Sequence, residues 1–427
     1  MAVAHNNEAE ILRIVGAAEQ ARLAGRREEA RRLLSQAQAI APDHPRVLGE
    51  AGLSHLQAGD AQAARQCLED ALKQDDRTPA LWLNLATVLR KLDLSSEEAK
   101  ALERVLALDP RHLFGLLQKA SLLERIGKPR AAAKMYVNAL LTIPRGAKLP
   151  ESLRPAIEHA QDAVRRNTAS LSAFLDDRLR ELRDQHASEP QERFEHCLAT
   201  YLGRSRIYVP EPNFLYYPKL PALEFHARED FPWLDRIEAG TAEIRSEFER
   251  VFTEDTGRLE PYIAYPEGVP LDQWAELNHS RRWSVFYLWR DGQPLKEHLE
   301  RCPRTAALLS EAPVADVPGH APSAFFSILD AKSHIPPHTG VTNTRLIVHL
   351  PLVIPGRCRF RVGSQTREWQ AGKAWVFDDT IEHEAWNDSD LPRAVLIFDV
   401  WNNYLNSTER ELVRTAVGGI GDYYHGE

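Results

Sequence analysis

Two histidines in the C-terminal half stand where turns separate strand-like runs, at positions from which they could bind a metal. His338 opens the run His-Thr-Gly-Val-Thr-Asn, and His383 follows 45 residues later within Asp-Asp-Thr-Ile-Glu-His-Glu. Neutral imidazole is a good ligand for borderline metals such as Fe(II), and strand ends open onto the mouth of a barrel. A third histidine, His334, stands alone and is expected to be a hydrogen-bonded surface residue. The pair therefore indicates a metal site.

Arg393 begins the run 393–401, which reads as a β-strand. Alternation places Arg393 on the same face as Val395, Ile397, Asp399 and Trp401, so a guanidinium must lie among apolar neighbours. Such a cation needs an anionic partner, and the terminal carboxylate of a dicarboxylate ligand could accept two parallel hydrogen bonds from it. The alternative is a salt bridge to one of three acids, Asp378, Asp379 and Glu384.

This order of groups is typical of one class of oxygenase. Fe(II)/2-oxoglutarate oxygenases built on a double-stranded β-helix use a metal-binding histidine, a second one about 45 residues on, and an arginine ten residues further, as here. They usually take another metal ligand from an Asp or Glu two residues after the first histidine. That position holds Gly340. The absence of this carboxylate ligand counts against a generic oxygenase and points to one branch of the class.

The stretch from about Tyr216 to Trp401 resembles the aspartyl/asparaginyl β-hydroxylase family. Many separated pieces match in the right order, which makes the resemblance specific where a single His-x-Gly would not be. The matching pieces are Phe231-Pro-Trp233, Cys302-Pro-Arg-Thr305, Phe326-Ser327-Ile328, Ile335-Pro-Pro-His338-Thr-Gly340-Val-Thr-Asn343, Arg345-Leu346, His349-Leu350, Gly372-Lys373, Phe377-Asp378-Asp379, Glu382-His383-Glu384, Trp386-Asn387, Arg393 and Asp399-Val-Trp401.

The family implies iron held by only two histidines, here His338 and His383, with water in the position of the missing carboxylate. By the same resemblance, Arg393 and Ser327 would hold the far carboxylate of 2-oxoglutarate, and His349 would help to hold its C1 carboxylate. The resemblance also implies the fold: a double-stranded β-helix, which is a jelly-roll or cupin-like domain, with flanking helices.

One departure from the family pattern concerns the cosubstrate. The family commonly reads Asn-x-Arg-Leu-Arg-x-His, whereas this chain has Ile347 in place of the second arginine. Alternation places Arg345, Ile347 and His349 on one side of their strand. A missing cation beside a carboxylate could cost about 1.5–3 kcal/mol. Three consequences stay open: weaker 2-oxoglutarate binding, a C1 contact shifted to Arg345, or a degenerate enzyme.

The first 144 residues repeat at a spacing of 34, with small residues or proline in five aligned columns. The columns are Ala18, Gly52, Ala86 and Ala120; Gly25, Gly59, Asp93 and Gly127; Ala30, Ala64, Glu98 and Ala132; Ala37, Ala71, Val105 and Ala139; and Pro42, Asp76, Pro110 and Pro144. The pattern resembles the tetratricopeptide repeat and predicts four helix hairpins, the third less regular. A generic α-hairpin bundle is the alternative. Stacked hairpins form a solenoid whose concave face usually holds a peptide or protein.

Composition changes along the rest of the chain suggest where domains begin. Helix-like spacing continues to about residue 203 and is expected to cap the solenoid. Prolines and tyrosines then crowd the sequence, and a helix over about 233–252 precedes short strands. The prediction is a multidomain α + β protein: an all-α repeat solenoid (7–147), a helical cap or linker (148–203) and an oxygenase domain (204–427).

The overall composition is that of an ordinary folded protein. The 427 residues suffice for two or three domains, and 43% are apolar and 27% charged. A net charge of −8 gives no bulk reason to bind nucleic acid or an anionic membrane. Four separated cysteines favour a reducing compartment, and the sequence shows neither a secretion signal nor an apolar run of about 20 residues. We expect a cytoplasmic protein without membrane insertion.

The expected activity is Fe(II)- and 2-oxoglutarate-dependent hydroxylation, with O2, at the β-carbon of Asp or Asn side chains in a peptide or protein substrate. The repeats would hold part of that substrate and raise its effective concentration. One alternative keeps the chemistry but acts on a lipid A acyl chain or another non-peptide substrate. Another is a repeat scaffold with a non-catalytic β-helix domain, for which Ile347 is the best indication.

Overall fold

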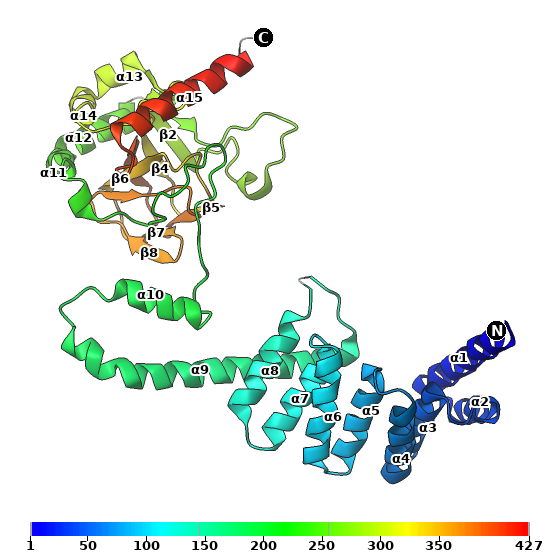
Figure 1. Ribbon diagram of the computed structural model, residues 1–427. Helices are drawn as coiled ribbons and strands as arrows, with labels where there is room; N and C mark the ends of the chain where they lie inside the picture. Colours follow the sequence, from blue (N-terminus) through cyan, green and yellow to red (C-terminus); the bar gives the residue numbers. More distant parts are fainter. Residues whose placement is uncertain (1, 145, 255, 426–427) are drawn as a thin grey trace. The chain divides into compact units, whose positions relative to one another are not determined.

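A computed structural model describes residues 2–144, 146–254 and 256–425. Residues 145, 255, 426 and 427, which the predicted domains include, lie outside the described residues. The chain divides into two compact units, residues 1–191 and 192–427 (Figure 1). The division falls within the stretch predicted as a cap or linker.

In the first unit, consecutive helices pair into hairpins. Within residues 2–144 these make four hairpins, as the repeat predicted. The helices are α1 (Ala2–Leu23), α2 (Arg27–Ile40), α3 (Pro45–Ala58), α4 (Ala61–Gln74), α5 (Pro79–Lys91), α6 (Ser95–Leu108), α7 (Leu113–Arg125) and α8 (Pro129–Leu141).

The repeated columns explain how each hairpin turns and packs. Gly25, Gly59 and Gly127 lie in the turns between paired helices with φ of 75°, 91° and 74°, a left-handed conformation that glycine adopts without steric cost. Gly52 has no room for a side chain, because a Cβ would lie 2.8 Å from Leu68 Cγ. The small residue therefore sets how closely α3 approaches α4.

The third repeat departs from the columns and still forms its hairpin. Asp93 takes the glycine position with φ of 60°. Glu98 is fully buried, and Arg125 of the next repeat donates to its Oε2 at 2.5 Å. Val105 is buried against Gly115, where a Cβ would lie 2.7 Å from Val105 Cγ1. An ion pair and a glycine in the following helix thus accommodate the larger residues.

A short 3-10 turn, η1 (Glu151–Leu153), leads into the long helix α9 (Arg154–Gln185). Ile157, Ala160 and Ala163 of this helix share one buried cluster with residues of α7 and α8. The helix therefore packs against the last hairpin of the repeats. Among the described residues, no helix combines the length and the apolar character that crossing a bilayer demands.

The helices of the second unit lie before, between and after its strands. They are α10 (Glu192–Tyr201), η2 (Arg228–Asp230), α11 (Leu234–Ala239), α12 (Thr241–Glu254), η3 (Thr256–Arg258), η4 (Asp272–Trp274), α13 (Lys296–Arg301), α14 (Pro303–Leu309) and α15 (Ser407–His425). The single helix expected over 233–252 was wrong, because Gly240 separates α11 from α12. A Cβ on Gly240 would lie 2.3 Å from Leu308 Cδ1, so close packing of α14 uses this position.

Over the described part of the second unit, the strands form two antiparallel sheets, which agrees with the expected fold class at this level. The larger has the order β1-β2-β4-β11-β6-β9, with β3 paired to β2, and the smaller has the order β5-β10-β7-β8. The strands are β1 (Glu260–Pro261), β2 (Trp283–Arg290), β3 (Gln293–Pro294), β4 (Ala324–Leu329), β5 (Ser333–His338), β6 (Arg345–Val353), β7 (Cys358–Val362), β8 (Gln365–Glu368), β9 (Trp375–Phe377), β10 (His383–Asn387) and β11 (Arg393–Trp401).

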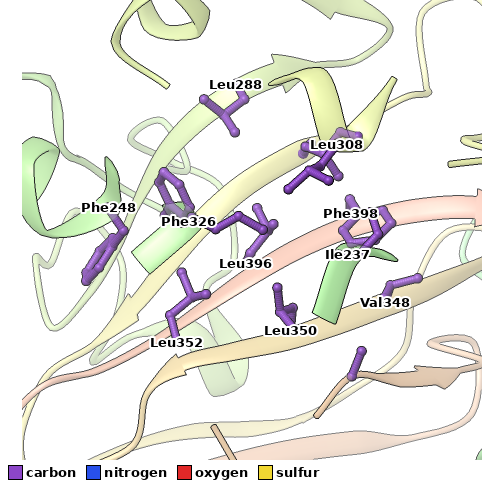
Figure 2. Packing of buried hydrophobic residues seen from close by; sticks show 14 of the residues in the cluster. Ile237, Phe248, Leu288, Leu308, Phe326, Val348, Leu350, Leu352, Leu396 and Phe398 are labelled. Atoms are coloured by element: carbon purple, nitrogen blue, oxygen red, sulfur yellow. The ribbon is translucent and has the colours of Figure 1, made fainter. Parts of the chain in front are cut away.

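The two faces of the larger sheet pack against different partners. Figure 2 shows one face, where Leu396 and Phe398 of β11 lie in the same core as Ile237 of α11 and Leu308 of α14. Val395 belongs instead to the core shared with the smaller sheet. Over residues 393–400 this is the alternation expected, and it directs the opposite set of β11 side chains to the space between the sheets.

Candidate active site

His338 and His383 meet across neighbouring strands. His338 ends β5, His383 begins β10, and the two are register partners in that strand pair. Their ring centroids are 4.0 Å apart. Both rings line the same cavity, the placement that two ligands of a single metal ion would require.

Backbone carbonyls orient both rings. His338 Nδ1 donates to the Pro336 carbonyl at 2.8 Å, and His383 Nδ1 donates to the Ile381 carbonyl at 3.1 Å. Such a bond keeps the proton on Nδ1 and leaves the lone pair at Nε2. Burial lowers the pKa of His338; burial, and then the neighbouring His338, holds the pKa of His383 well below its ordinary value. Both rings are therefore neutral, the form that a metal requires.

Gly340 leaves no room for a metal-binding side chain at its own position. A Cβ there would lie 2.0 Å from Asp379 Oδ2, and the Gly340 N–H donates to the Asp379 carbonyl at 2.6 Å. The Asp379 carboxylate therefore fills the space in which an Asp or Glu side chain would begin. Burial raises the pKa of Asp379 to about 7. Clusters of three or more His, Cys, Asp or Glu suited to a metal do not occur among the described residues, so a metal here would rest on the histidine pair.

Arg393 lies deep in the space between the sheets, with 1% of its surface exposed. Its Nη1 donates to Ser327 Oγ at 3.4 Å, and its guanidinium lies 4.6 Å from the Trp369 ring centroid. Within the described residues no carboxylate pairs with it, and its Nε has no hydrogen-bond partner. Burial lowers the pKa of Arg393 to about 10, and the side chain remains a cation at neutral pH. The site thus holds a buried positive charge without an anion of its own.

The salt-bridge alternative for Arg393 is wrong, because the three candidate acids make other contacts. Asp378 accepts the hydrogen bonds of the turn that follows it. Glu384 accepts a hydrogen bond from His334 Nε2 at 2.9 Å. Asp379 packs against Gly340. The expectation for His334 is confirmed: its side chain is 43% exposed and hydrogen-bonded outside the site.

Ser327 and His349 line the same cavity as Arg393. Ser327 Oγ accepts from Trp283 Nε1 at 3.1 Å as well as from Arg393, so its hydroxyl hydrogen is available to a ligand. His349 is buried, and its Nδ1 has no partner among the described residues. Burial, and then the nearby Arg393, holds the pKa of His349 well below its ordinary value. The residues expected to hold a dicarboxylate therefore surround one cavity.

Arg345, Ile347 and His349 all line this cavity, as the alternation along β6 predicted. Arg345 Nη1 forms a salt bridge with Asp399, which also accepts the Ser323 N–H at 3.1 Å. Burial raises the pKa of Asp399 to about 6. Sequence reasoning missed this ion pair. Alternation along the sequence already placed Asp399 on the ligand face of β11. The sequence did not show that β6 and β11 are neighbours, so the pairing of Arg345 with Asp399 could not be predicted.

The cavity has a volume of about 590 Å³, enough for a dicarboxylate and one further side chain. Aromatic rings form much of its wall, which the sequence did not indicate. Trp274 lies edge-on to His338 at 5.0 Å between centroids, and Tyr262 stacks on Trp283 at 4.1 Å. These rings line the cavity beside the histidine pair.

Comparison with known proteins confirms the family resemblance. Residues 238–403, which hold the cavity and most of the strands, match the family described as aspartyl/asparaginyl beta-hydroxylase. Residues 21–89 match the tetratricopeptide repeat. The chain therefore carries a region similar to aspartyl/asparaginyl β-hydroxylases after helix hairpins similar to tetratricopeptide repeats.

Curated relatives align with the hydroxylase domain. The aspartyl/asparaginyl beta-hydroxylase of Mus musculus is 34% identical over 183 residues, 42% of this chain and 24% of that protein. The ornithine lipid ester-linked acyl 2-hydroxylase of Rhizobium tropici is 34% identical over 188 residues, 43% of this chain and 63% of that protein. The alignment with the mouse protein thus covers about a quarter of its length. A solved structure, the APC/C hetero-tetramer Cut9-Hcn1, aligns with 35% of this chain and 29% of its own at 21% identity and a TM-score of 0.32, too low to carry an argument.

Proposed function

We propose that this protein is an Fe(II)- and 2-oxoglutarate-dependent dioxygenase that hydroxylates the β-carbon of Asp or Asn side chains in a peptide or protein. The observation that carries the proposal is Arg393, a buried cation without an anion, in the cavity that also holds two adjacent neutral histidines. A ligand that brings a carboxylate to this arginine and oxygen donors to a metal beside the histidines satisfies both features. 2-Oxoglutarate has a carboxylate at one end and oxygen donors for a metal at the other. We further propose that the two sheets form the double-stranded β-helix implied by the family.

The residues present fit this cofactor set. His338 and His383 would hold Fe(II) through Nε2, Arg393 and Ser327 would hold the far carboxylate of 2-oxoglutarate, and His349 would hold its C1 carboxylate. Arg345 is a second candidate for the C1 contact, although its charge is already balanced by Asp399. Bound Fe(II), together with 2-oxoglutarate and O2, supplies the oxidising chemistry that places one oxygen atom on a C–H bond and yields succinate and CO2.

The chain's own contribution is orientation and exclusion of water. Arg393 and Ser327 would fix the cosubstrate at one end, so that its other end lies toward the histidine pair. The carbonyl bonds to His338 and His383 hold both rings in one orientation before any ligand arrives. Closure of the aromatic wall around bound ligands would displace water and strengthen the electrostatic contacts made there.

The repeats support a peptidic substrate or partner. We propose that the concave face of the solenoid holds a segment remote from the reacting residue and thereby raises its effective concentration. We also propose that the protein acts in the cytoplasm.

Anaerobic titration with Fe(II) and 2-oxoglutarate tests the cofactor set. The wild-type protein should develop the weak visible charge-transfer band of a metal–2-oxoglutarate chelate. His338→Ala and His383→Ala should each abolish it, because two ligands are already the minimum. His334→Ala is the matched control, since this histidine lies outside the cavity, and it should leave the band unchanged. If the wild-type band is missing at millimolar 2-oxoglutarate, the protein is a scaffold with a non-catalytic sheet domain.

A second candidate substrate is a lipid acyl chain, favoured by the 34% identity to the Rhizobium tropici acyl 2-hydroxylase. Mass spectrometry distinguishes the two. Peptide pools containing Asp and Asn, and in parallel vesicles containing ornithine lipid, are incubated with the full chain, Fe(II) and 2-oxoglutarate. A gain of one oxygen in the peptides supports the principal proposal, whereas a gain confined to the lipid replaces it.

A further inference from the structure

We propose that the substrate subsite of this cavity selects a primary carboxamide over a carboxylate, so that the protein acts on Asn in preference to Asp. The inference rests on the proposed function and concerns only which side chain the remaining part of the cavity accepts. Its evidence is the distribution of charges and hydrogen-bonding atoms around that space.

Every arginine that lines the cavity already has an assigned partner. Arg345 is paired with Asp399. Arg290, at the rim, is paired with Glu260 and covers the Tyr287 ring. Arg393 is the cation proposed for the far carboxylate of 2-oxoglutarate. Among the described lining residues, no arginine or lysine is left to neutralise an acidic substrate side chain.

Ile347 marks the place where a further cation is lacking. It lies on β6 between Arg345 and His349 along the cavity face and is the register partner of Asp399 on β11. It packs with Trp283, Ile335 and other apolar residues between the sheets. This part of the wall therefore attracts no negative charge.

The remaining polar group beside the histidines is an acceptor. Asp379 lines the cavity, packs against Gly340, and has no hydrogen-bond partner for Oδ1 among the described residues. A carboxamide carries N–H donors as well as an acceptor oxygen and can pair with a carboxyl group on this wall in either protonation state, whereas a carboxylate carries acceptors only. An acidic side chain would also bring like charge close to Asp379 and Asp399.

Isothermal titration calorimetry on the full chain tests the inference without turnover. The protein is loaded with Mn(II), which does not support the oxidation, and with saturating 2-oxoglutarate to occupy Arg393. Three isosteric probes are then titrated: the N-acetyl methylamides of asparagine, aspartate and leucine. We expect the asparagine probe to bind about tenfold or more tightly than the aspartate probe, and more tightly than the leucine probe, which leaves the acceptor unsatisfied.

The outcomes separate this inference from the proposed function. Failure of 2-oxoglutarate itself to bind in the loading step refutes the proposed function, and the inference with it. If 2-oxoglutarate binds, an aspartate probe that binds as tightly as the asparagine probe overturns the inference alone. The same holds if the leucine probe is preferred, or if the asparagine probe gives no saturable heat.

A variant provides an independent arm. Ile347→Arg places a cation on the cavity face and should raise aspartate-probe affinity about tenfold or more, with no gain for the asparagine probe. Ile347→Leu is the matched control and should change neither affinity. If Ile347→Arg does not fold, the comparison of the three probes on the wild-type protein still decides the question.

Discussion

Each unit of this protein buries a charged side chain, and the two charges are treated in opposite ways. In the repeats, Glu98 takes a position that alanine holds in the neighbouring units, and Arg125 of the next repeat pairs with it. Between the sheets, Arg393 is equally inaccessible, and no carboxylate among the described residues pairs with it. The first charge is neutralised by the fold itself. The second is left for a ligand.

The difference separates a structural from a functional use of buried charge. A buried ion pair satisfies its own members and contributes modestly to stability. A buried charge without a partner costs stability, and a folded chain tolerates that cost where binding compensates for it. Within the cavity itself the same contrast recurs, because Arg345 has its partner in Asp399 and Arg393 has none.

The largest expected effect comes from removing the unpaired cation. Arg393→Met should weaken 2-oxoglutarate binding about 100-fold, because a bidentate charged contact is lost. It should leave the melting temperature of the ligand-free protein unchanged or raised, since an apolar side chain replaces an unpaired buried charge. Fe(II)/2-oxoglutarate titration and thermal unfolding measure the two effects. Arg359→Met, at an exposed salt bridge, is the control. Undiminished affinity in Arg393→Met would remove this residue from the ligand-binding set.

The next effect concerns the tight contact beside the histidine pair. Gly340→Ala should destabilise the protein by about 1–3 kcal/mol and impair metal binding, because its Cβ would overlap the Asp379 carboxylate. Combining it with Asp379→Ala should restore much of the stability, since the overlap disappears. Urea unfolding of the single and double variants measures this coupling. If the two changes prove additive, the close packing at Gly340 has no energetic role.

Breaking the paired charge in the repeats should have a smaller and purely structural effect. Glu98→Gln keeps the shape but loses the ionic partner of Arg125, and should lower the stability of the protein by about 1–2 kcal/mol. Arg125 is partly exposed, so water limits the loss. Glu103→Gln, which changes the exposed member of a pair with Lys119, should change stability little. A change in 2-oxoglutarate affinity in Glu98→Gln would contradict the division of roles between the two buried charges.

The smallest effects are expected in the hairpin turns. Gly59→Ala places a Cβ at φ of 91° and should cost about 1 kcal/mol. Asp93→Gly, at φ of 60°, should be neutral or stabilising by less than about 1 kcal/mol, because glycine relieves the strain but widens the unfolded ensemble. Thermal unfolding of both variants distinguishes them. Equal effects would mean that the turn geometry does not depend on the glycine column.

Much of the architecture could be predicted because it depends on short-range periodicity. A spacing of 34 with small residues in fixed columns is enough to predict the hairpins and their turns, since each column serves a contact within one repeat or between neighbours. Alternation along 393–400 likewise predicted which side chains of β11 pack under the helices and which face the cavity side. For Trp401 the prediction was wrong, because its ring packs with Leu405 and Val413 in another cluster. The prediction of one helix over 233–252 failed at Gly240, a position that packs closely against Leu308, a residue far along the chain.

The amino-acid sequence by itself determined the repeat period, the strand faces and the residue types that could bind a metal and a diacid, because these follow from local geometry and side-chain chemistry. Only the tertiary structure decided which charges neutralise one another. Register between β6 and β11, and the packing of Asp379 against Gly340, bring together residues that no local pattern relates. Because these charges are buried, each must be paired within the protein or by a ligand. The fold pairs Arg345 with Asp399 and leaves Arg393 for a ligand.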